Sequence, residues 1–310
     1  MSRPRIGVVG VGYLGRFHAQ KYSANSQCDF VGVYDSSPER ATEIGKELAC
    51  GVFLDLNDML HKVDGVSIAA STKAHFEIGK FFLSHGKHVL LEKPIAENSS
   101  QAEELCKIAQ EKKLVLQVGH IERFNPTYLK AKELLSNPVY AEFNRSAPFR
   151  ARGADVNVIF DVMIHDIDLM LDVFSGEPKI KSVSGRSIVS QDIDQCRVEF
   201  EFESGTRAVI IGDRTHPEVQ RSILFHQKDG SVLANLAKNQ VLHSKRVGEY
   251  PSSSEPLSVV DLPIEKVDAL QMETESFVDC VLNGKSPRVS GIDGLRALKF
   301  AERVQQELKK

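Results

Sequence analysis

The tripeptide Glu92-Lys93-Pro94 places a carboxylate and an ammonium group directly after the apolar run His88-Val89-Leu90-Leu91. Gly86 precedes this run and Pro94 closes it, which is typical of a short buried strand. Ligands of open α/β sheets bind beyond the carboxyl ends of the strands, so the tripeptide is a candidate ligand site. A solvated strand exit is the alternative interpretation of the same residues.

A second candidate site lies in the apolar segment 158–169, which carries Asp161, His165 and Asp168. Their spacing of i, i+4 and i+7 predicts one helix with all three on the same face. Ionisable groups on an apolar helix need water or a partner, so this face lines a cleft or pairs internally. A carboxylate beside an imidazole fixes its tautomer and raises its basicity, which suits proton transfer.

The same three residues have two competing interpretations, a structural polar network and a metal site. A metal is disfavoured because the helix offers a single imidazole. No other His/Cys cluster in the sequence supplies the missing ligands. We therefore predict no metal.

A glycine-rich turn, Gly10-Val11-Gly12-Tyr13-Leu14-Gly15, follows a predicted strand and opens a predicted helix. Gly10 permits the tight turn, Gly12 lets the backbone approach a pyrophosphate, and Gly15 lets helix and strand pack closely. Free N–H groups at the helix start hold phosphates. With an acidic residue, Asp35, ending the next strand about 20 residues farther on, the pattern is the dinucleotide-binding fingerprint.

Asp35 is expected to accept hydrogen bonds from the adenosine ribose hydroxyls and to repel a 2′-phosphate, which favours NAD. Ser36 and Arg40 are close enough in sequence to leave NADP open. A plain turn residue is the alternative role for Asp35.

The first part of the chain alternates predicted strands and helices, as in a parallel sheet covered on both faces. The helix after the glycine turn is expected to bury Leu14, Phe17 and Tyr22. The predicted strands cover residues 5–9, 30–34, 66–70, 89–91 and 114–118.

The second part has long alternating segments and a hairpin signal, Lys228-Asp229-Gly230, between two apolar runs. Helices are predicted over residues 271–282 and 295–308. The predicted boundary lies near residue 119. Residues 1–119 are expected to form an α/β Rossmann domain, and residues 120–310 an α+β domain with an open-faced, mainly antiparallel sheet.

The composition is that of an ordinary globular protein, with 310 residues, 42% of them hydrophobic, and a formal net charge of −3. This charge gives no reason to expect nucleic acid, and no apolar stretch is long enough to span a membrane. The N-terminus leads straight into a strand, so no signal peptide is expected. Five cysteines without metal-type spacing are typical of reduced thiols, which predicts a cytoplasmic protein.

Taken in order, the glycine motif with Asp35, the Glu92-Lys93-Pro94 tripeptide and the segment 158–169 resemble the glucose-fructose oxidoreductase/inositol dehydrogenase (Gfo/Idh/MocA) family. The resemblance covers essentially the whole chain and implies a nicotinamide-dependent oxidoreductase that acts on carbohydrate hydroxyl groups. It implies that Lys93 and His165 flank the reacting hydroxyl, that Asp161 supports them, and that the Lys93–Pro94 bond is cis. The cofactor-binding residues it implies are Gly10, Gly12, Tyr13, Leu14, Gly15, Asp35, Ser71, Thr72, His75, Glu92, Lys93 and His120.

Residues 118–126 and 154–168 more narrowly resemble UDP-N-acetylglucosamine 3-dehydrogenases, which make a 3-keto sugar nucleotide for later transamination. Such products feed lipid A, a part of lipopolysaccharide, or related surface glycans. Arg123, Arg150 and Arg152 are candidates for binding the UDP diphosphate, because a guanidinium group pairs well with phosphate. The alternative is that they are exposed arginines that only make the protein more soluble. The substrate-binding residues implied are Lys93, Arg123, Asn125, Arg150, Arg152, Asn157, Asp161 and His165.

The partners that the resemblance implies are a UDP-sugar substrate, 2-oxoglutarate as co-oxidant, a downstream aminotransferase and further copies of the chain. The open sheet face predicts a homodimer or homotetramer. Another sugar or inositol dehydrogenase of the same family stays open as an alternative, as does a non-catalytic NAD-binding redox sensor. Retention of Lys93 and His165 argues against the sensor, while the choice between them as the base stays open.

Overall fold

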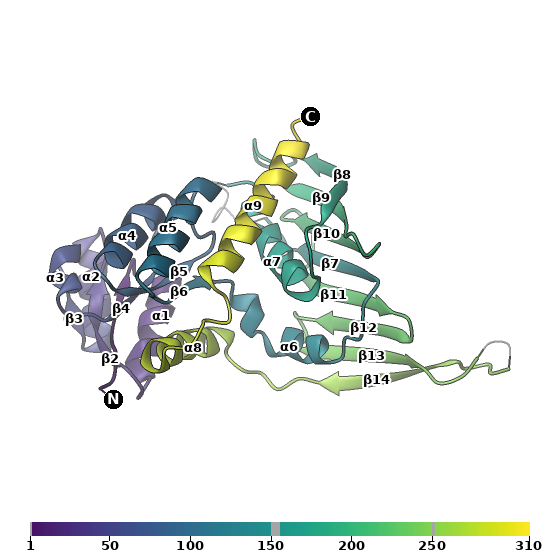
Figure 1. Ribbon diagram of the computed structural model, residues 1–310, viewed down its shortest axis with the longest axis horizontal. Coiled ribbons are helices and arrows are strands. Elements are labelled where there is room, and N and C mark those ends of the chain that lie inside the picture. Colours follow the sequence, from purple (N-terminus) through teal and green to yellow (C-terminus); the bar gives the residue numbers. More distant parts are fainter. Residues whose placement is uncertain (1, 150–155, 250–251) are drawn as a thin grey trace. The chain divides into compact units, whose positions relative to one another are not determined.

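The computed structural model describes residues 2–149, 156–249 and 252–310, which form two compact units (Figure 1). The first unit contains the chain up to Ile121 together with Asp268–Lys299. The second contains Glu122–Val267 and Phe300–Lys310. This division differs from the predicted one, in which residues 120–310 formed a single domain, because Asp268–Lys299 belongs to the first unit.

The first unit is built on a six-stranded parallel sheet in the order β3-β2-β1-β4-β5-β6. This is the strand order of a Rossmann fold, with its topological switch between β1 and β4. Each strand is short, and β4, β5 and β6 are almost completely buried. The strands are β1 (Arg5–Val9), β2 (Asp29–Tyr34), β3 (Gly51–Val52), β4 (Gly65–Ile68), β5 (His88–Glu92) and β6 (Leu116–Gly119).

Helices connect these strands, as the alternating sequence pattern predicts. Ser37 caps α2 by accepting a hydrogen bond from the Arg40 N–H, and Pro38 is its first residue. The helices of this unit are α1 (Tyr13–Ala24), α2 (Pro38–Leu48), α3 (Leu56–Leu60), α4 (Thr72–Ser84), α5 (Ser99–Glu111) and α8 (Ala269–Asn283).

Helix α8 joins the first unit because its apolar face completes that unit's core. Phe277, Val278 and Cys280 lie in one buried cluster with Ile6 and Val8 of β1. Helix α9 (Gly291–Glu307) begins in the first unit and ends in the second. The chain therefore returns to its N-terminal unit, which local sequence patterns did not indicate.

The buried face of α1 differs from the predicted one. Phe17 was expected in the core, but it is 37% exposed and packs edge-on against the exposed ring of Tyr13. Tyr22 is buried as predicted, and it shares the buried face with His18 and Ala19. The reason is that Gly15 faces the strand, so the residues three and four positions later face it too.

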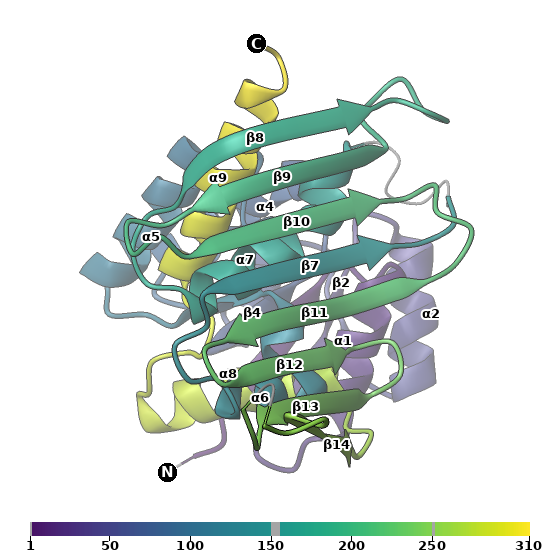
Figure 2. The same ribbon diagram turned by 90° about the vertical axis from the view of Figure 1, so that its right-hand side faces the viewer.

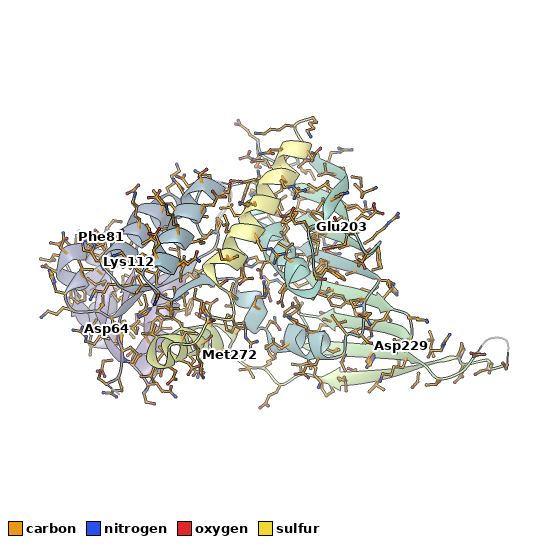
Figure 3. The ribbon with its side chains drawn as sticks, in the orientation of Figure 1. Asp64, Phe81, Lys112, Glu203, Asp229 and Met272 are labelled. Carbon is orange, nitrogen blue, oxygen red and sulfur yellow. The ribbon has the colours of Figure 1, made fainter. Side chains whose placement is uncertain are left out.

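The second unit is built on an eight-stranded sheet in the order β14-β13-β12-β11-β7-β10-β9-β8, whose strands Figure 2 shows side by side. Every pair is antiparallel except β7 and β10. The predicted hairpin is confirmed, and Asp229, labelled in Figure 3, lies in its turn. The strands are β7 (Tyr140–Ser146), β8 (Lys179–Arg186), β9 (Gln195–Glu201), β10 (Arg207–Asp213), β11 (Gln220–Gln227), β12 (Gly230–Asn235), β13 (Gln240–Arg246) and β14 (Leu257–Pro263).

One face of this sheet is buried under helices and the other is open. The helical elements are η1 (Ile121–Phe124), α6 (Pro126–Glu133), the π-helical turn η2 (Ile159–Met163) and α7 (Ile164–Val173). Helix α6 packs on β12 and β13, while η2 and α7 pack on β10. The fold is thus the predicted pair, an α/β Rossmann unit and an α+β unit with an open-faced, mainly antiparallel sheet. No helix in the described part of the chain combines the length and apolar character that membrane crossing requires.

Candidate active site

The glycine turn between β1 and α1 has the backbone geometry that its sequence predicts. Gly10 has a φ of +82°, and a Cβ there would lie 2.7 Å from the Ala70 nitrogen. A Cβ on Gly15 would lie 1.8 Å from the carbonyl oxygen of Gly10. A Cβ on Gly12 would meet no protein atom within 4 Å. Gly10 and Gly15 are therefore required by the fold, whereas Gly12 leaves open space beside the backbone.

The N-terminus of α1 has no side-chain cap. Gly12 is its capping residue and supplies no side chain to the first N–H groups of the helix. N–H groups at a helix start and the helix dipole favour a phosphate at this position. Open space at Gly12 and the uncapped start of α1 fit a dinucleotide pyrophosphate.

Asp35 lies at the end of β2 and is 7% exposed. Its carboxylate accepts hydrogen bonds from the Val11 N–H at 2.7 Å and the Ser37 N–H at 2.9 Å. A third contact joins Asp35 to a guanidinium nitrogen of Arg40 at 3.4 Å. These bonds fix the carboxylate beside the glycine turn, where the fingerprint requires it.

His75 ties the end of β4 to the Lys93-Pro94 turn. Its ring nitrogens lie 2.8 Å from the Pro94 carbonyl oxygen and 3.1 Å from that of Ala70. Burial lowers the pKa of His75, although these carbonyl oxygens oppose the effect. A neutral ring donates to one of the two carbonyl groups at a time.

The other predicted cofactor residues differ in exposure. Tyr13 is 67% exposed, and Leu14 is half-buried. Ser71 is the exposed N-cap of α4, and Thr72 is its first residue. His120 is buried in the short segment after β6.

Lys93 follows the last residue of β5, as predicted, and its bond to Pro94 is cis. The Glu92 carboxylate accepts from the Lys93 backbone N–H at 3.3 Å through one oxygen and from His18 Nε2 at 3.0 Å through the other. Gly119 lies against the same carboxylate, since a Cβ there would be 2.8 Å from it. Lys93 is half-buried and is held at its backbone by a fixed carboxylate.

The segment with Asp161 and His165 is not one regular helix. Asp161 lies in the π-helical turn η2 and His165 in the first turn of α7, and both are half-buried. The Asn157 side chain accepts from the N–H groups of Ile159 and Phe160, which starts this segment. A π-helical turn inside a helix is frequent at functional sites.

Asp168, predicted on the same helix face as Asp161 and His165, lies in α7 and is buried. Its two carboxylate oxygens accept from Arg123 at 2.7 and 2.9 Å. Arg123 also pairs with Asp172 and is 5% exposed. Its contact with a substrate diphosphate stays a prediction, and the structure gives the guanidinium two carboxylate partners, the buried Asp168 and the half-buried Asp172.

Three further residues, Asn125, Arg150 and Arg152, were predicted to bind substrate. Asn125 caps α6 by accepting from the Thr127 N–H, and its amide donates to Glu122. Glu122 in turn pairs with Arg145, which also binds Asp166, so a second buried network escaped the sequence interpretation. Arg150 and Arg152 lie outside the described residues.

A buried cluster of polar residues surrounds Glu92, and the sequence patterns did not indicate it. One ligand-type atom from each of His18, Glu92 and Glu273 lies within 4.8 Å of the others. His18 stands three residues after Gly15, so its position on the strand-facing side of α1 was the available signal. Among the described residues, these three lie close enough together for a shared metal ion.

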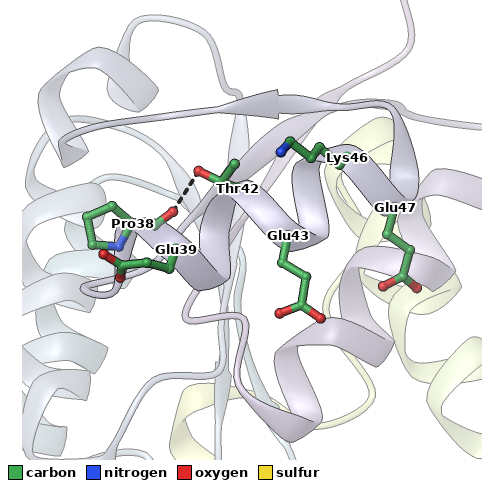
Figure 4. Close-up of a pocket in the computed structure, with 6 residues that line it drawn as sticks. All are labelled: Pro38, Glu39, Thr42, Glu43, Lys46 and Glu47. Carbon is green, nitrogen blue, oxygen red and sulfur yellow. Dashed lines mark hydrogen bonds between the residues drawn. The ribbon is translucent and has the colours of Figure 1, made fainter.

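A shallow hollow on the exposed side of α2 is a different feature. Figure 4 shows its lining residues, with the Thr42 hydroxyl donating to the Pro38 carbonyl. Three glutamates, Glu39, Glu43 and Glu47, surround it, so it is poorly suited to a phosphate-bearing ligand.

Comparison with known proteins agrees with this geometry. Residues 4–120 match an oxidoreductase family with an NAD-binding Rossmann fold, and residues 136–233 match the GFO/IDH/MocA C-terminal domain. The chain is 35% identical over 308 residues to a UDP-N-acetylglucosamine 3-dehydrogenase of Acidithiobacillus ferrooxidans, covering 98% of this chain and 97% of the relative. An inositol 2-dehydrogenase of Rhizobium meliloti is 26% identical, covering 96% of this chain and 94% of the relative.

A solved structure of the Acidithiobacillus ferrooxidans UDP-N-acetylglucosamine 3-dehydrogenase resembles this fold closely. Its TM-score is 0.91 at 34% identity, and the match covers 100% of this chain and 99% of that chain. Both family domains and a full-length relative above 30% identity are thus matched. The chain belongs to the GFO/IDH/MocA family of NAD-binding oxidoreductases.

Proposed function

We propose that this protein oxidises the 3-hydroxyl of UDP-N-acetylglucosamine to the 3-keto sugar nucleotide, with NAD as the electron acceptor. The observation that carries the proposal is the 35% identity, over nearly the full length of both chains, to a UDP-N-acetylglucosamine 3-dehydrogenase. The inositol dehydrogenase relative has lower identity, so inositol oxidation is the second candidate.

Lys93, His165 and Asp161 carry the chemistry in this proposal. The substrate hydroxyl gives its proton to His165 or to Lys93. A nicotinamide cofactor held at the glycine turn would supply the acceptor for the hydride of the substrate carbon. Asp161 orients the imidazole, and a charged Lys93 stabilises the developing alkoxide. The Glu92 contact at the Lys93 backbone supports a fixed position for this lysine.

NAD rather than NADP is the proposed cofactor. The Asp35 carboxylate is held by two backbone N–H groups beside the glycine turn, where it suits ribose hydroxyls and repels a 2′-phosphate. Arg40 is already paired with Asp35, which supports the same choice. Tyr13, Leu14, Ser71, Thr72 and His120 complete the proposed cofactor site.

Substrate binding is proposed to use Asn125, Asn157, Arg150 and Arg152 in addition to the residues above. The proposed setting is cytoplasmic synthesis of a 3-amino sugar for lipid A or a related surface glycan. An aminotransferase would consume the keto product, and 2-oxoglutarate would reoxidise the reduced cofactor. The chemistry supports this order, because a keto group is what transamination requires.

The open face of the second sheet is proposed to bind a second copy of the chain. Leu224, Leu233 and Leu242 are half-buried neighbours in register on β11, β12 and β13, on the face opposite the buried Ile223 and Phe225. An apolar ladder in the middle of an open face supports a homodimer or homotetramer. Leu233→Glu should lower the mass measured by light scattering if this face forms the contact.

The test of the function is a substrate panel. Purified protein is incubated with NAD and with UDP-N-acetylglucosamine, other UDP-sugars or myo-inositol, with and without 2-oxoglutarate. NADH absorbance and mass spectrometry of the product are followed. Loss of two hydrogens from UDP-N-acetylglucosamine is the expected result, whereas oxidation of inositol alone would establish the second candidate.

Active-site variants separate an enzyme from a redox sensor. Lys93→Ala and His165→Gln should each lower kcat by about 10²-fold or more while NAD binding persists. Lys62→Ala and His61→Gln, at exposed positions after α3, serve as matched controls that keep full activity. A sensor would keep its function in cells with Lys93 replaced.

A further inference from the structure

The carboxylate of Glu92 belongs to a buried polar cluster that the proposed reaction does not use directly. His18 on α1 lies between two partners, with Nε2 3.0 Å from Glu92 and Nδ1 2.8 Å from the Ser67 hydroxyl on β4. His18 and Ser67 are fully buried. A carboxylate only accepts, so an ionised Glu92 requires the His18 proton on Nε2, and the Ser67 hydroxyl then donates to Nδ1.

Glu273 on α8 brings a second carboxyl group to this cluster. Its side chain is fully buried, and neither carboxyl oxygen has a hydrogen-bond partner among the described residues. One of its oxygens lies within 4.8 Å of both His18 and Glu92. The backbone around it is fixed, because the Gln117 amide donates to the Glu273 carbonyl oxygen.

Two buried carboxyl groups at this separation do not both carry a charge. An unpaired buried carboxylate costs several kcal/mol, whereas a protonated acid avoids most of that cost. Burial raises the pKa of Glu273 well above its usual value, and the charge of Glu92 raises it further. Burial would also raise the pKa of Glu92, but the hydrogen bond from His18 and the positive charge of Lys93 hold it below its usual value.

A proton accounts for this cluster better than a metal ion. The lone pair that His18 would offer to a metal at Nε2 is replaced by a proton in the bond to Glu92. Coordination would also need both carboxylates ionised in a buried site. One proton between the two carboxyl groups removes the repulsion and leaves the His18 bonds intact.

We propose that Glu92 and Glu273 form a buried acid pair that holds a single proton on Glu273, and that this pair sets the charge behind Lys93. Glu273 is thereby a positioning residue, because it acts on Lys93 only through Glu92. With one proton in the pair, a single negative charge faces the lysine and favours its ammonium form. This functional consequence rests on the proposed function, whereas the protonation state does not.

The groups that titrate around Glu92 come from every element packed on it. His18 and Tyr22 lie on α1, His75 on α4, Lys93 after β5, and Glu273 on α8. Burial raises the pKa of Tyr22 well above its usual value, so the phenol stays neutral. In this environment Glu273 is the proton-holding acid and Glu92 the charged one.

Infrared spectroscopy of the purified protein tests the protonation state without any substrate. The wild type should show the carbonyl stretch of a protonated carboxylic acid at neutral pH, and Glu273→Gln should lose it. Glu275→Gln, two residues away on the exposed side of α8, should keep it. If Glu273→Gln fails to fold, titrating the wild type to alkaline pH should remove the same band. Absence of the band, or one tightly bound metal ion per chain by elemental analysis, would overturn the proposal.

Stability gives a second test that is also independent of activity. A carboxyl whose folded pKa is raised contributes stability below its unfolded pKa of about 4.3 and loses that contribution as pH rises. Glu273→Gln should therefore gain stability relative to the wild type as pH rises above about 4.3. A variant that instead loses relative stability as pH rises would mean that Glu273 is ionised in the fold.

The pH dependence of kcat/KM tests the effect on Lys93. In Glu92→Gln, the limb governed by Lys93 should move to lower pH by about one unit, because the ammonium loses its negative neighbour. In Glu273→Gln, that limb should stay in place, because the residue it replaces is already neutral. A shift in Glu273→Gln equal to that in Glu92→Gln would refute the assignment, even with the dehydrogenase activity intact.

Discussion

Arg123 binds Asp168 through two parallel hydrogen bonds, from Nε at 2.7 Å and from a terminal nitrogen at 2.9 Å. The guanidinium is 5% exposed and the carboxylate 1% exposed. The pair joins the short segment after β6 to helix α7, inside the second unit. It gives Asp168 a structural role and leaves Asp161 and His165 as the pair proposed for proton transfer.

Arg123→Ala should destabilise the second unit by about 3–5 kcal/mol, because it leaves Asp168 buried without its cation. Calorimetric unfolding measures this as a lower melting temperature. Lys130→Ala, which removes an exposed pair with Glu133, is the matched control and should cost under about 1 kcal/mol. An Arg123→Ala protein with unchanged stability but weaker UDP-sugar binding would restore the diphosphate role for this arginine.

Gly12→Ala should weaken NAD binding by about tenfold or more while leaving the melting temperature unchanged. The added methyl group meets no protein atom within 4 Å, so the apo fold accommodates it, but it occupies the space beside the backbone. Isothermal titration with NAD measures the affinity.

Gly15→Ala is the informative contrast to Gly12→Ala. Its Cβ would lie 1.8 Å from the Gly10 carbonyl oxygen, so the turn must deform. The expected result is a loss of at least about 1–3 kcal/mol in stability. Equal effects of the two substitutions on stability would contradict the distinction drawn between these glycines.

Asp35→Ser should raise the KM for NAD by about tenfold and increase the relative use of NADP. The substitution removes the carboxylate that is proposed to repel a 2′-phosphate, and it releases Arg40 from its contact. The measurement is the ratio of kcat/KM for the two cofactors. Arg40→Ala in the Asp35→Ser background should reverse the gain for NADP, and an unchanged ratio in Asp35→Ser would show that Asp35 does not select the cofactor.

Asp194 should make the stability of the second unit depend on pH. It accepts from the N–H groups of Ile188, Val189 and Ser190 and pairs with Arg214. Burial would raise the pKa of Asp194, but these donors hold it well below its usual range. A depressed carboxyl pKa contributes stability above the unfolded value of about 3.9, and that contribution is lost as pH falls below it.

Asp194→Asn should therefore cost about 2–3 kcal/mol at neutral pH and progressively less below about pH 4. Denaturant unfolding at neutral pH and below about pH 4 measures the difference in unfolding free energy between the variant and the wild type. Asp192→Asn, at an exposed position in the same loop, should change neither value. A difference that stays constant with pH would mean that the Asp194 charge does not contribute.

The sequence by itself determined the elements that depend on local chemistry. The strand Arg5–Val9 with its glycine turn and the hairpin around Asp229 were predicted from a few adjacent residues. The parallel and antiparallel sheets followed from the same patterns, because strand alternation and turn residues are readable within short windows.

Tertiary structure alone decided which polar groups meet. Glu92 and His18 are 74 residues apart in the sequence, Arg123 and Asp168 are 45 apart, and Glu273 reaches the cluster from a helix predicted to belong to the other domain. A buried charge must find a partner wherever the fold supplies one, and periodicity along the chain does not specify that partner. Lys93 was therefore readable as a candidate from its strand end, while the buried groups around Glu92 emerged only from the folded chain.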